Sequence, residues 1–231
     1  MSWRLLPLLT ALFARLVPLA RAHALRLVLL FAGVLAPLVV FGMLAEEVAE
    51  REAFPFDRPL LDAAHRIAGP GLDAAMRLVS LVGYAWGVVP ATAGVLLCLL
   101  AWRRWRAAVF FGVATLGSAL LNLGAKAVFA RPRPALWPSI APELTWSFPS
   151  AHAMGSMALV AALAVLAWPT RARVPVLVLG GAFVVAVGVS RVYLGVHYPS
   201  DVLAGWAAAL GWVMGTAAVL HPSSGTPEAM R

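Results

Sequence analysis

Residues 24–44 read ALRLVLLFAGVLAPLVVFGML, an apolar run in which Arg26 is the single charged residue. An α-helix rises about 1.5 Å per residue, so about 20 apolar residues cross the hydrocarbon core of a bilayer. Further apolar runs occur at residues 80–102, 107–129, 149–169, 174–190 and 202–220. The pattern therefore predicts an all-α fold in which six transmembrane helices form an integral membrane bundle.

The composition of the whole chain agrees with a membrane protein. Of its 231 residues, 62% are hydrophobic and 12% are charged, and the mean hydropathy is +0.87. Soluble domains contain about 25% charged residues, twice the share found here. We expect one membrane domain at residues 24–220 and a disordered tail at residues 221–231. The polar connection at residues 45–79 is expected to form short amphipathic helices that break at the Gly-Pro-Gly sequence of residues 69–71.

The N-terminal segment at residues 1–23 allows two interpretations. Arg4 and Arg15 project from nearly the same face of a helix, which favours an amphipathic helix lying in the membrane interface. The apolar stretch LLPLLTALFA, followed by Ala-His-Ala at residues 22–24, would instead suit a cleaved signal peptide. Because Arg15 interrupts the apolar stretch, we favour the interfacial helix.

The basic residues predict the orientation of the bundle. They produce a formal charge of +8, but they lie in short clusters rather than on one dense face, so we expect no nucleic acid partner. Cytoplasmic loops of membrane proteins are rich in Lys and Arg. By the order of the helices, three clusters share one side: Arg4, Arg15, Arg21 and Arg26; Arg103, Arg104 and Arg106; and Arg171 and Arg173. We expect this side, with both termini, to be cytoplasmic, in a multi-pass protein of the cytoplasmic membrane.

Apart from the polar connection at residues 45–79, most of the remaining ionisable residues gather on the opposite, non-cytoplasmic side. They lie in three segments: KAVFARPRP at residues 126–134, FPSAHA at residues 148–153 and SRVYLGVHYPSD at residues 190–201. Each group alone has an ordinary explanation, since an arginine can reach lipid head groups and an acid can occupy the first turn of a helix. Charges near a bilayer are costly and usually face a cavity or a partner, so the three segments together predict a functional site.

The residue types in these segments favour the binding of an anion. Lys126, Arg133 and Arg191 outnumber the carboxylates, and arginine forks beside a helix N-terminus suit a tetrahedral phosphate. A metal centre built from the two histidines and Asp201 is the competing hypothesis. The cations would repel a divalent ion, and these segments contain no second carboxylate, so we expect neither a metal nor another cofactor.

With a phosphate bound, the two histidines can divide the chemistry between them. His197 is the predicted nucleophile, because Asp201 lies four residues later and can accept a hydrogen bond from one ring nitrogen while the other attacks phosphorus. His152 is then the general acid that protonates the leaving oxygen. The basic residues and the amide groups at the opening of the fourth helix are expected to stabilise the transition state.

These residues resemble the three motifs of the type 2 phosphatidic acid phosphatase family, the lipid phosphate phosphatases, whose site is shared with vanadium haloperoxidases. The motif Lys-x6-Arg-Pro is matched by Lys126, Arg133 and Pro134. Residues 149–152 match Pro-Ser-Gly-His, with Ala151 in place of glycine. The motif Ser-Arg-x5-His-x3-Asp is matched in full by Ser190, Arg191, His197 and Asp201.

The resemblance implies a phosphohistidine intermediate on His197, supported by Asp201, with His152 as the acid and without a metal. The implied phosphate ligands, to which we add Ala151 and Ser190, are Lys126, Arg133, Ser150 and Arg191. Alanine at position 151 would be strained only if the backbone there needed a positive φ. Arg131 lies outside the spaced pattern and receives no role.

We therefore expect an integral membrane phosphatase of phospholipid and cell-envelope metabolism, which removes the terminal phosphate from a lipid phosphate or diphosphate at the outer face of the membrane. Its expected partners are this substrate and the membrane lipids, and the family likeness implies undecaprenyl diphosphate, phosphatidylglycerol phosphate or phosphatidic acid as substrate. The alternative is a non-catalytic anion- or lipid-binding membrane protein, or a small transporter. Ionisable residues at one face rather than at the midplane speak against a transporter, and six spans exclude a soluble haloperoxidase-like enzyme.

Overall fold

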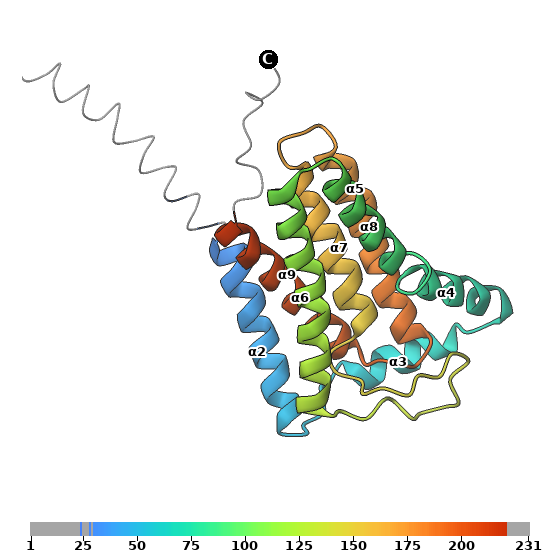
Figure 1. Ribbon diagram of the computed structural model, residues 1–231. Helices are drawn as coiled ribbons and strands as arrows, with labels where there is room; N and C mark the ends of the chain where they lie inside the picture. The colour runs from blue at the N-terminus through green and yellow to red at the C-terminus, as the bar shows by residue number, and fades with distance from the viewer. Residues whose placement is uncertain (1–23, 25–27, 29, 221–231) are drawn as a thin grey trace, which may run out of the picture.

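The computed structural model describes residues 24, 28 and 30–220, and every regular element in this part of the chain is helical (Figure 1). The interfacial helix, the signal peptide and the disordered tail expected at the two ends lie outside the described residues, as do Arg4, Arg15, Arg21 and Arg26. The elements are the π-helix η1 (Phe31–Leu35) and the α-helices α2 (Ala36–Ala49), α3 (Asp57–Arg66), α4 (Pro70–Val82), α5 (Val88–Ala101), α6 (Trp105–Phe129), α7 (Ala151–Ala167), α8 (Arg173–Tyr193) and α9 (Pro199–Leu220).

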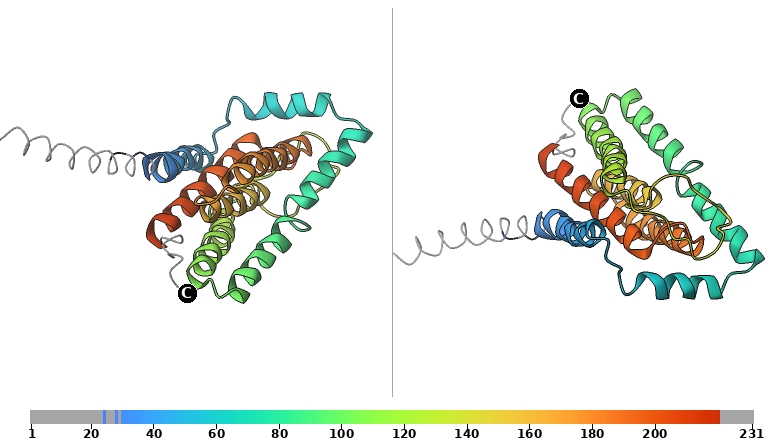
Figure 2. Two further views of the ribbon diagram at one scale, coloured as in Figure 1. Left: turned by 90° about the horizontal axis from the view of Figure 1, so that it is seen from above. Right: turned by 90° about the horizontal axis from the view of Figure 1, so that it is seen from below.

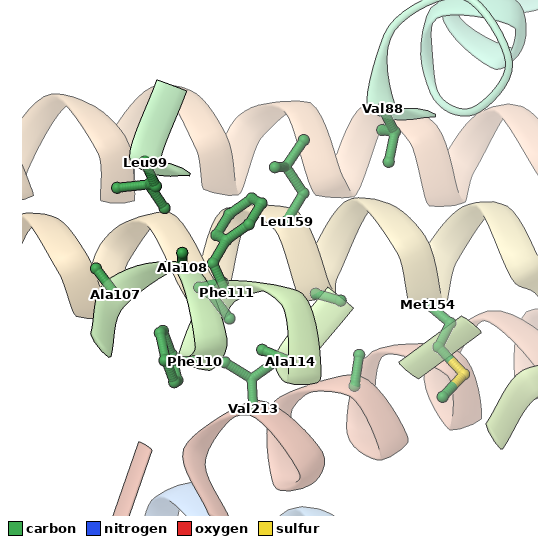
Figure 3. Packing of buried hydrophobic residues seen from close by; sticks show 14 residues of the cluster. Val88, Leu99, Ala107, Ala108, Phe110, Phe111, Ala114, Met154, Leu159 and Val213 are labelled. Carbon is green, nitrogen blue, oxygen red and sulfur yellow. The ribbon is translucent and has the colours of Figure 1, made fainter. Parts of the chain in front are cut away.

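Helix α7 lies inside the bundle and packs against α5, α6, α8 and α9. Its sequence is rich in alanine, which lets helix backbones approach one another closely in a membrane protein. A cluster of buried side chains joins α6, α7 and α9 through Phe110, Phe111, Leu159 and Val213 (Figure 3). Helix α2 packs on α9 at the edge of the bundle, so the order of the helices in space differs from their order along the chain.

Several helices have the length and composition of membrane spans. The continuous helix Phe31–Ala49 and helices α6, α8 and α9 are each long and apolar enough to cross a bilayer. Helices α5 and α7 are apolar but shorter, with 14 and 17 residues. The predicted all-helical membrane bundle is therefore confirmed, whereas the count of six spans stays a prediction.

The apolar run at residues 80–102 does not form the single helix that we expected. The chain turns at residues 83–87 and separates α4 from α5. A side chain at Gly83 would lie 2.8 Å from Val187 of α8, and one at Gly87 would lie 2.1 Å from the carbonyl oxygen of Val82. Close packing around these two glycines thus favours a turn rather than a continuous helix. As a result, α4 projects sideways from the bundle (Figure 1). The expected break at residues 69–71 agrees with the start of α4 at Pro70.

The connections at one end of the bundle position the functional residues. Helix α6 ends at Phe129. Its C-cap residue Ala130 adopts the left-handed conformation with φ 41° and ψ 38°, and Pro132 prevents the helix from continuing. The connection between α6 and α7 then runs across the end of the bundle where α8 meets α9 and where α3 lies (Figures 1 and 2). All three segments singled out in the sequence therefore lie at the same end of the molecule.

Candidate active site

The predicted site residues come from the ends of four helices. Lys126 lies in the last turn of α6, His152 in the first turn of α7, Arg191 in the last turn of α8 and Asp201 in the first turn of α9. His197 lies in the turn between α8 and α9. Four of these five residues are buried, and His152 is nearly so. The structure thus gathers side chains that are far apart in the sequence into one enclosed region.

The turn between α8 and α9 directs His197 into this region. Gly195 adopts a positive φ of 67°, and a side chain there would meet the indole of Trp137 at 2.8 Å. The N–H groups of Val196 and His197 both donate to the carbonyl oxygen of Arg191, at 3.2 Å and 3.4 Å. A tight reversal of the chain therefore holds the imidazole beside the end of α8.

The neighbours of His197 determine its tautomer. Nη1 of Arg133 lies 3.0 Å from Nε2 of the ring, and a guanidinium only donates hydrogen bonds, so Nε2 is the acceptor nitrogen. The proton is then on Nδ1, which lies 3.4 Å from Oδ2 of Asp201 and 3.5 Å from Oγ of Ser147. A carboxylate thus orients one nitrogen while the other keeps a lone pair for attack.

The surroundings of His197 also keep its ring neutral. Burial lowers the pKa of His197 to about 4; the hydrogen bond to Asp201 opposes this shift, and the charges of Arg133 and Arg191 add to it. Burial likewise lowers the pKa of Arg133, an effect that Glu143 partly offsets, but an arginine remains charged at neutral pH. The imidazole is therefore in the nucleophilic form at neutral pH.

Asp201 is held through both of its carboxylate oxygens. Oδ2 accepts hydrogen bonds from the hydroxyl of Ser147 and from the backbone N–H of Tyr198, the latter at 2.9 Å, in addition to facing His197. Oδ1 lies 2.5 Å from Nη1 of Arg131. Because donors approach from several sides, this buried carboxylate has a fixed orientation toward the imidazole.

A carboxylate from outside the three motifs lies between the basic residues. Glu143, in the connection between α6 and α7, pairs through Oε1 with Arg191 and through Oε2 with Nη2 of Arg133 at 2.6 Å. The same oxygens lie 3.8 Å from Nδ1 of His152 and 3.9 Å from Nε2 of His197. Burial alone would raise the pKa of Glu143, but attraction by the charged Arg191 and Arg133 outweighs burial and lowers it. One anion therefore faces both arginines and both imidazoles.

His152 and Lys126 border the same anion-binding region. Nδ1 of His152 is buried without a hydrogen-bond partner among the described residues, and the ring packs against Tyr84 with centroids 4.9 Å apart. Lys126 donates from Nζ to the carbonyl oxygen of Trp146. The free nitrogen of His152 lies where a leaving oxygen next to the bound anion would need a proton.

The start of α7 has the features of an anion-binding helix terminus. Ser150 is the N-cap residue: its hydroxyl accepts from the N–H of Ala153 at 3.5 Å, and its own N–H donates to the first turn of α9. Ala151 is not among the described residues with a positive φ, so alanine is unstrained where the family motif has glycine. Ser190 is buried beside Arg191, and its hydroxyl donates to the carbonyl of Val187 in its own helix at 2.6 Å.

Sequence reasoning missed several residues of this site. Glu143 and Ser147 lie between the first and second motifs, whereas Asp57 and Ser80 belong to α3 and α4. Ser80 accepts a hydrogen bond from buried Arg191. The available signal for Glu143 was its position as the one acidic residue between Lys126 and His152. The other three have no spacing that marks them, because only the folded chain brings them to the motifs.

The described part of the chain contains no group of three or more His, Cys, Asp or Glu side chains that could hold a metal ion. Within the site, Glu143 and Asp201 are each paired with arginine. These carboxylates are therefore engaged by cations of the protein itself, and the expectation of a metal-free reaction stays a prediction for experiment.

Comparison with known proteins assigns the chain to a family. The family model of the PAP2 superfamily matches residues 107–223, a range that contains all three motifs. The chain belongs to the PAP2 superfamily. A curated relative of this PAP2 protein, phosphatidylglycerophosphatase B from Bacillus subtilis (strain 168), is 29% identical over 179 residues, and the match covers 74% of this chain and 86% of the relative.

Two solved structures are similar to this PAP2 protein. The crystal structure of a transmembrane PAP2-type phosphatidylglycerolphosphate phosphatase from Bacillus subtilis has a TM-score of 0.69 and 25% identity, covering 79% of this chain and 94% of that chain. The crystal structure of Aquifex aeolicus LpxE shares the fold with a TM-score of 0.57 and 21% identity, covering 71% and 95%. The predicted class, a membrane lipid phosphatase, is confirmed by the family and these relatives.

Proposed function

We propose that this PAP2 enzyme hydrolyses the terminal phosphate of a membrane lipid through a phosphohistidine intermediate on His197. The observation that supports this proposal most strongly is the position of the Glu143 carboxylate. It lies between Arg133 and Arg191, with ring nitrogens of His152 and His197 at 3.8 Å and 3.9 Å. An anion at this position faces the two arginines and the two histidines of the proposed mechanism. We expect the phosphoryl group of the substrate to displace Glu143 and bind there.

In the first step, Nε2 of His197 attacks phosphorus while the bond from phosphorus to the lipid oxygen breaks. Asp201 accepts the hydrogen bond from Nδ1 and stabilises the positive charge that develops on the ring. His152, once it has taken up a proton in the complex with the substrate, donates that proton to the departing lipid oxygen, because an unprotonated alkoxide is a poor leaving group. Arg133 and Arg191 stabilise the charge on the equatorial phosphoryl oxygens.

In the second step, water attacks phosphorus and the bond from phosphorus to His197 breaks. His152, now neutral, takes a proton from this water, so inorganic phosphate leaves and both histidines return to their starting states. Lys126 and the N–H groups at the start of α7, including that of Ala151, are the remaining phosphate donors in this proposal. The last donor in this proposal is Ser190, whose hydroxyl would give up its hydrogen bond to the carbonyl oxygen of Val187 and donate to a phosphate oxygen instead.

The substrate class follows from the family, and the first lipid to test follows from the relatives. The names of the Bacillus subtilis relatives support phosphatidylglycerol phosphate, with undecaprenyl diphosphate and phosphatidic acid as the other candidates. All three carry a terminal phosphate that the two arginines and the lysine can bind. The three lipids differ in the group to which this terminal phosphate is bonded.

The membrane arrangement is part of the same proposal. We propose six spans, with α5 and α7 crossing as short helices beside the four longer ones. The site lies at the end opposite the loops that contain Arg103, Arg104, Arg106, Arg171 and Arg173. Since basic loops favour the cytoplasm, the catalytic end faces the outside of the cytoplasmic membrane, with both termini inside.

Phosphate release by the purified protein tests the proposal. The three candidate lipids are offered separately in detergent, with excess EDTA present. We expect turnover of at least one lipid, inhibition by vanadate, and loss of turnover in a folded His197→Ala variant. Full activity of that variant would contradict the mechanism, and turnover that requires added divalent metal would contradict a metal-free reaction.

A further inference from the structure

Arg131 and Asp57 form an ion pair directly behind the Asp201 carboxylate. Nη1 of Arg131 lies 2.5 Å from Oδ1 of Asp201, and Nη2 lies 3.0 Å from Oδ2 of Asp57. Asp57 also accepts hydrogen bonds from Ser200, at 2.8 Å from its N–H and at 2.6 Å from its hydroxyl. Arg131 donates to the same hydroxyl at 2.8 Å. One guanidinium therefore bridges two carboxylates in a closed hydrogen-bond network.

The surroundings of Arg131 leave little of this bridge exposed. Its side chain is 13% exposed, and those of Asp57 and Asp201 are 6% and 0% exposed. The guanidinium carbon lies 4.0 Å from the ring centre of Tyr198 and 5.7 Å from that of Phe54. A planar guanidinium presents several donors in fixed directions, so it can bind two carboxylates at once, whereas an ammonium group is a point charge.

The geometry separates Arg131 from the phosphate-binding residues. It binds Oδ1 of Asp201, the oxygen that faces away from His197, while Oδ2 faces Nδ1 of the ring. The other described contacts of its side chain are with Asp57, Ser200 and the two aromatic rings. Arg133, two residues later, contacts Glu143 in the anion site instead. Two neighbouring arginines of one segment therefore have different partners.

We infer that Arg131 and Asp57 are positioning residues for His197 and act through Asp201. The inference rests on the roles proposed above for His197 and Asp201. Arg131 holds Oδ1 of Asp201, so Oδ2 of Asp201 stays directed at Nδ1 of His197. The lone pair on Nε2 of His197 then stays directed at the position of the Glu143 carboxylate. Asp57, the first residue of α3, holds the other side of the guanidinium and ties α3 to the catalytic turn.

Kinetics of four single variants test this assignment. Arg131→Gln removes the charge, Arg131→Lys keeps the charge without the fork, and Asp57→Asn removes the second carboxylate. Arg58→Gln is the matched control. Arg58 follows Asp57 in α3, is exposed, and pairs with Asp62. Loss of a group that orients a metal-bound histidine typically costs about 10- to 100-fold, and we take the same range for His197 by analogy. We expect a fall of this size in kcat for Arg131→Gln, an intermediate kcat for Arg131→Lys, and wild-type kcat for Arg58→Gln.

Vanadate affinity distinguishes positioning from phosphate binding. Because Arg131 lies away from the anion site, the inhibition constant of vanadate is expected to stay within about twofold of wild type in Arg131→Gln. In Arg133→Gln, by contrast, vanadate inhibition is expected to weaken together with kcat/KM. An equal loss of kcat and of vanadate affinity in Arg131→Gln would overturn the inference, because it would place Arg131 on the phosphate.

The pH profile distinguishes positioning from a general loss of structure. The charged and titratable groups that face His197 are Asp201, Arg133, Arg191, Glu143 and His152. Removing the charge of Arg131 leaves the Asp201 carboxylate less compensated, which raises the pKa of His197. Since the neutral ring is the reactive form, the acid limb of kcat/KM moves to higher pH. A merely structural defect would lower the amount of active protein and leave the limb in place.

Two further variants make every outcome decisive. If Arg131→Gln does not fold, the double variant Arg131→Gln/Asp57→Asn removes both charges of the pair and is expected to fold with the same loss of kcat. Wild-type kcat in either folded variant would overturn the inference. His197→Ala, measured alongside, separates the two proposals. If it is active, the proposed mechanism fails; if it is inactive while Arg131→Gln matches wild type, only the positioning role fails.

Discussion

Glu143 holds the position that the proposed mechanism assigns to the phosphoryl group. Its carboxylate pairs with Arg133 and Arg191, so substrate must break two ion pairs before it binds. A binding site that is occupied by a group of the protein has a lower apparent affinity for its ligand. Glu143 also keeps buried Arg191 and half-buried Arg133 paired when no substrate is bound.

Replacing Glu143 is therefore expected to strengthen the binding of phosphate analogues. Removal of a competing ion pair worth about 1 kcal/mol corresponds to roughly a fivefold gain in affinity. We predict that Glu143→Gln lowers the inhibition constant of vanadate by about this factor, as measured by phosphate release. Asp62→Asn, which changes an exposed acid of α3, serves as the control and is expected to have no effect. Weaker inhibition by vanadate in Glu143→Gln would contradict competition by this carboxylate.

The pKa of His197 leads to a prediction about activity in acid. Burial lowers this pKa to about 4, so the ring stays neutral well below the ordinary histidine value of about 6.5. We predict that kcat/KM, after correction for ionisation of the substrate, shows its acid limb below pH 6. Circular dichroism over the same range checks that the protein remains folded. An acid limb near 6.5 would show that the free enzyme has an ordinary histidine at this position.

Motif spacing predicts which catalytic side chains belong together but not what surrounds them. His197 and Asp201 are four residues apart, so their contact was predictable from the sequence. Arg131 was visible in the same stretch as Arg133, yet its partner Asp57 lies 74 positions earlier and no local pattern connects the two. Such partners were not predictable because they depend on how α3 docks on α9.

At the scale of elements, the junction of α7 and α9 shapes the phosphate-binding terminus. The N–H of Ser150 donates to the carbonyl oxygen of Asp201 at 3.1 Å, which links the cap of α7 to the first turn of α9. Gly205, one turn further along α9, makes room for this contact. A Cβ at this position would lie 2.9 Å from the carbonyl oxygen of Ser150 and 3.2 Å from the Cβ of Ala153.

Alanine at position 205 is expected to push α7 away from α9. Overpacking of this kind typically costs about 1–3 kcal/mol, and here it also shifts the N–H groups that face the phosphate. We predict that Gly205→Ala lowers both the melting temperature and kcat/KM. Gly181→Ala in α8 is the matched control, since no atom lies within 4 Å of the added Cβ. It is expected to leave activity unchanged and to stabilise the helix slightly. Equal behaviour of the two variants would contradict the role of the α7–α9 contact.

Apolar run length predicted the long helices more successfully than the breaks between elements. The runs at residues 107–129 and 202–220 correspond closely to α6 and α9. The run at residues 80–102 was misjudged because the residues on both sides of the turn are apolar, so hydropathy contains no signal for it. Packing of Gly83 against Val187 of α8 decides that break, and such a contact is known only from the fold.

For the whole molecule, the distribution of basic loops predicts its orientation in the membrane. Cys98 is the one cysteine of the chain, so a Cys98→Ala background allows single cysteines to be placed at either end. Leu144 is fully exposed at the catalytic end, and Arg171 is exposed in the loop at the opposite end. We predict that a membrane-impermeant maleimide labels Leu144→Cys in intact cells and Arg171→Cys only after permeabilisation. The reverse pattern would place the catalytic end in the cytoplasm.

The central claim is that the ends of four helices form one phosphoryl pocket in which His197 is the nucleophile. The most direct test is to incubate the enzyme with a lipid phosphate labelled on phosphorus, quench it rapidly in alkali, in which phosphohistidine survives, and map the label by mass spectrometry. We predict label on His197 that increases with substrate, is removed by water during turnover, and is absent from the His197→Ala variant. Label on another residue, or undiminished turnover without His197, would contradict the claim.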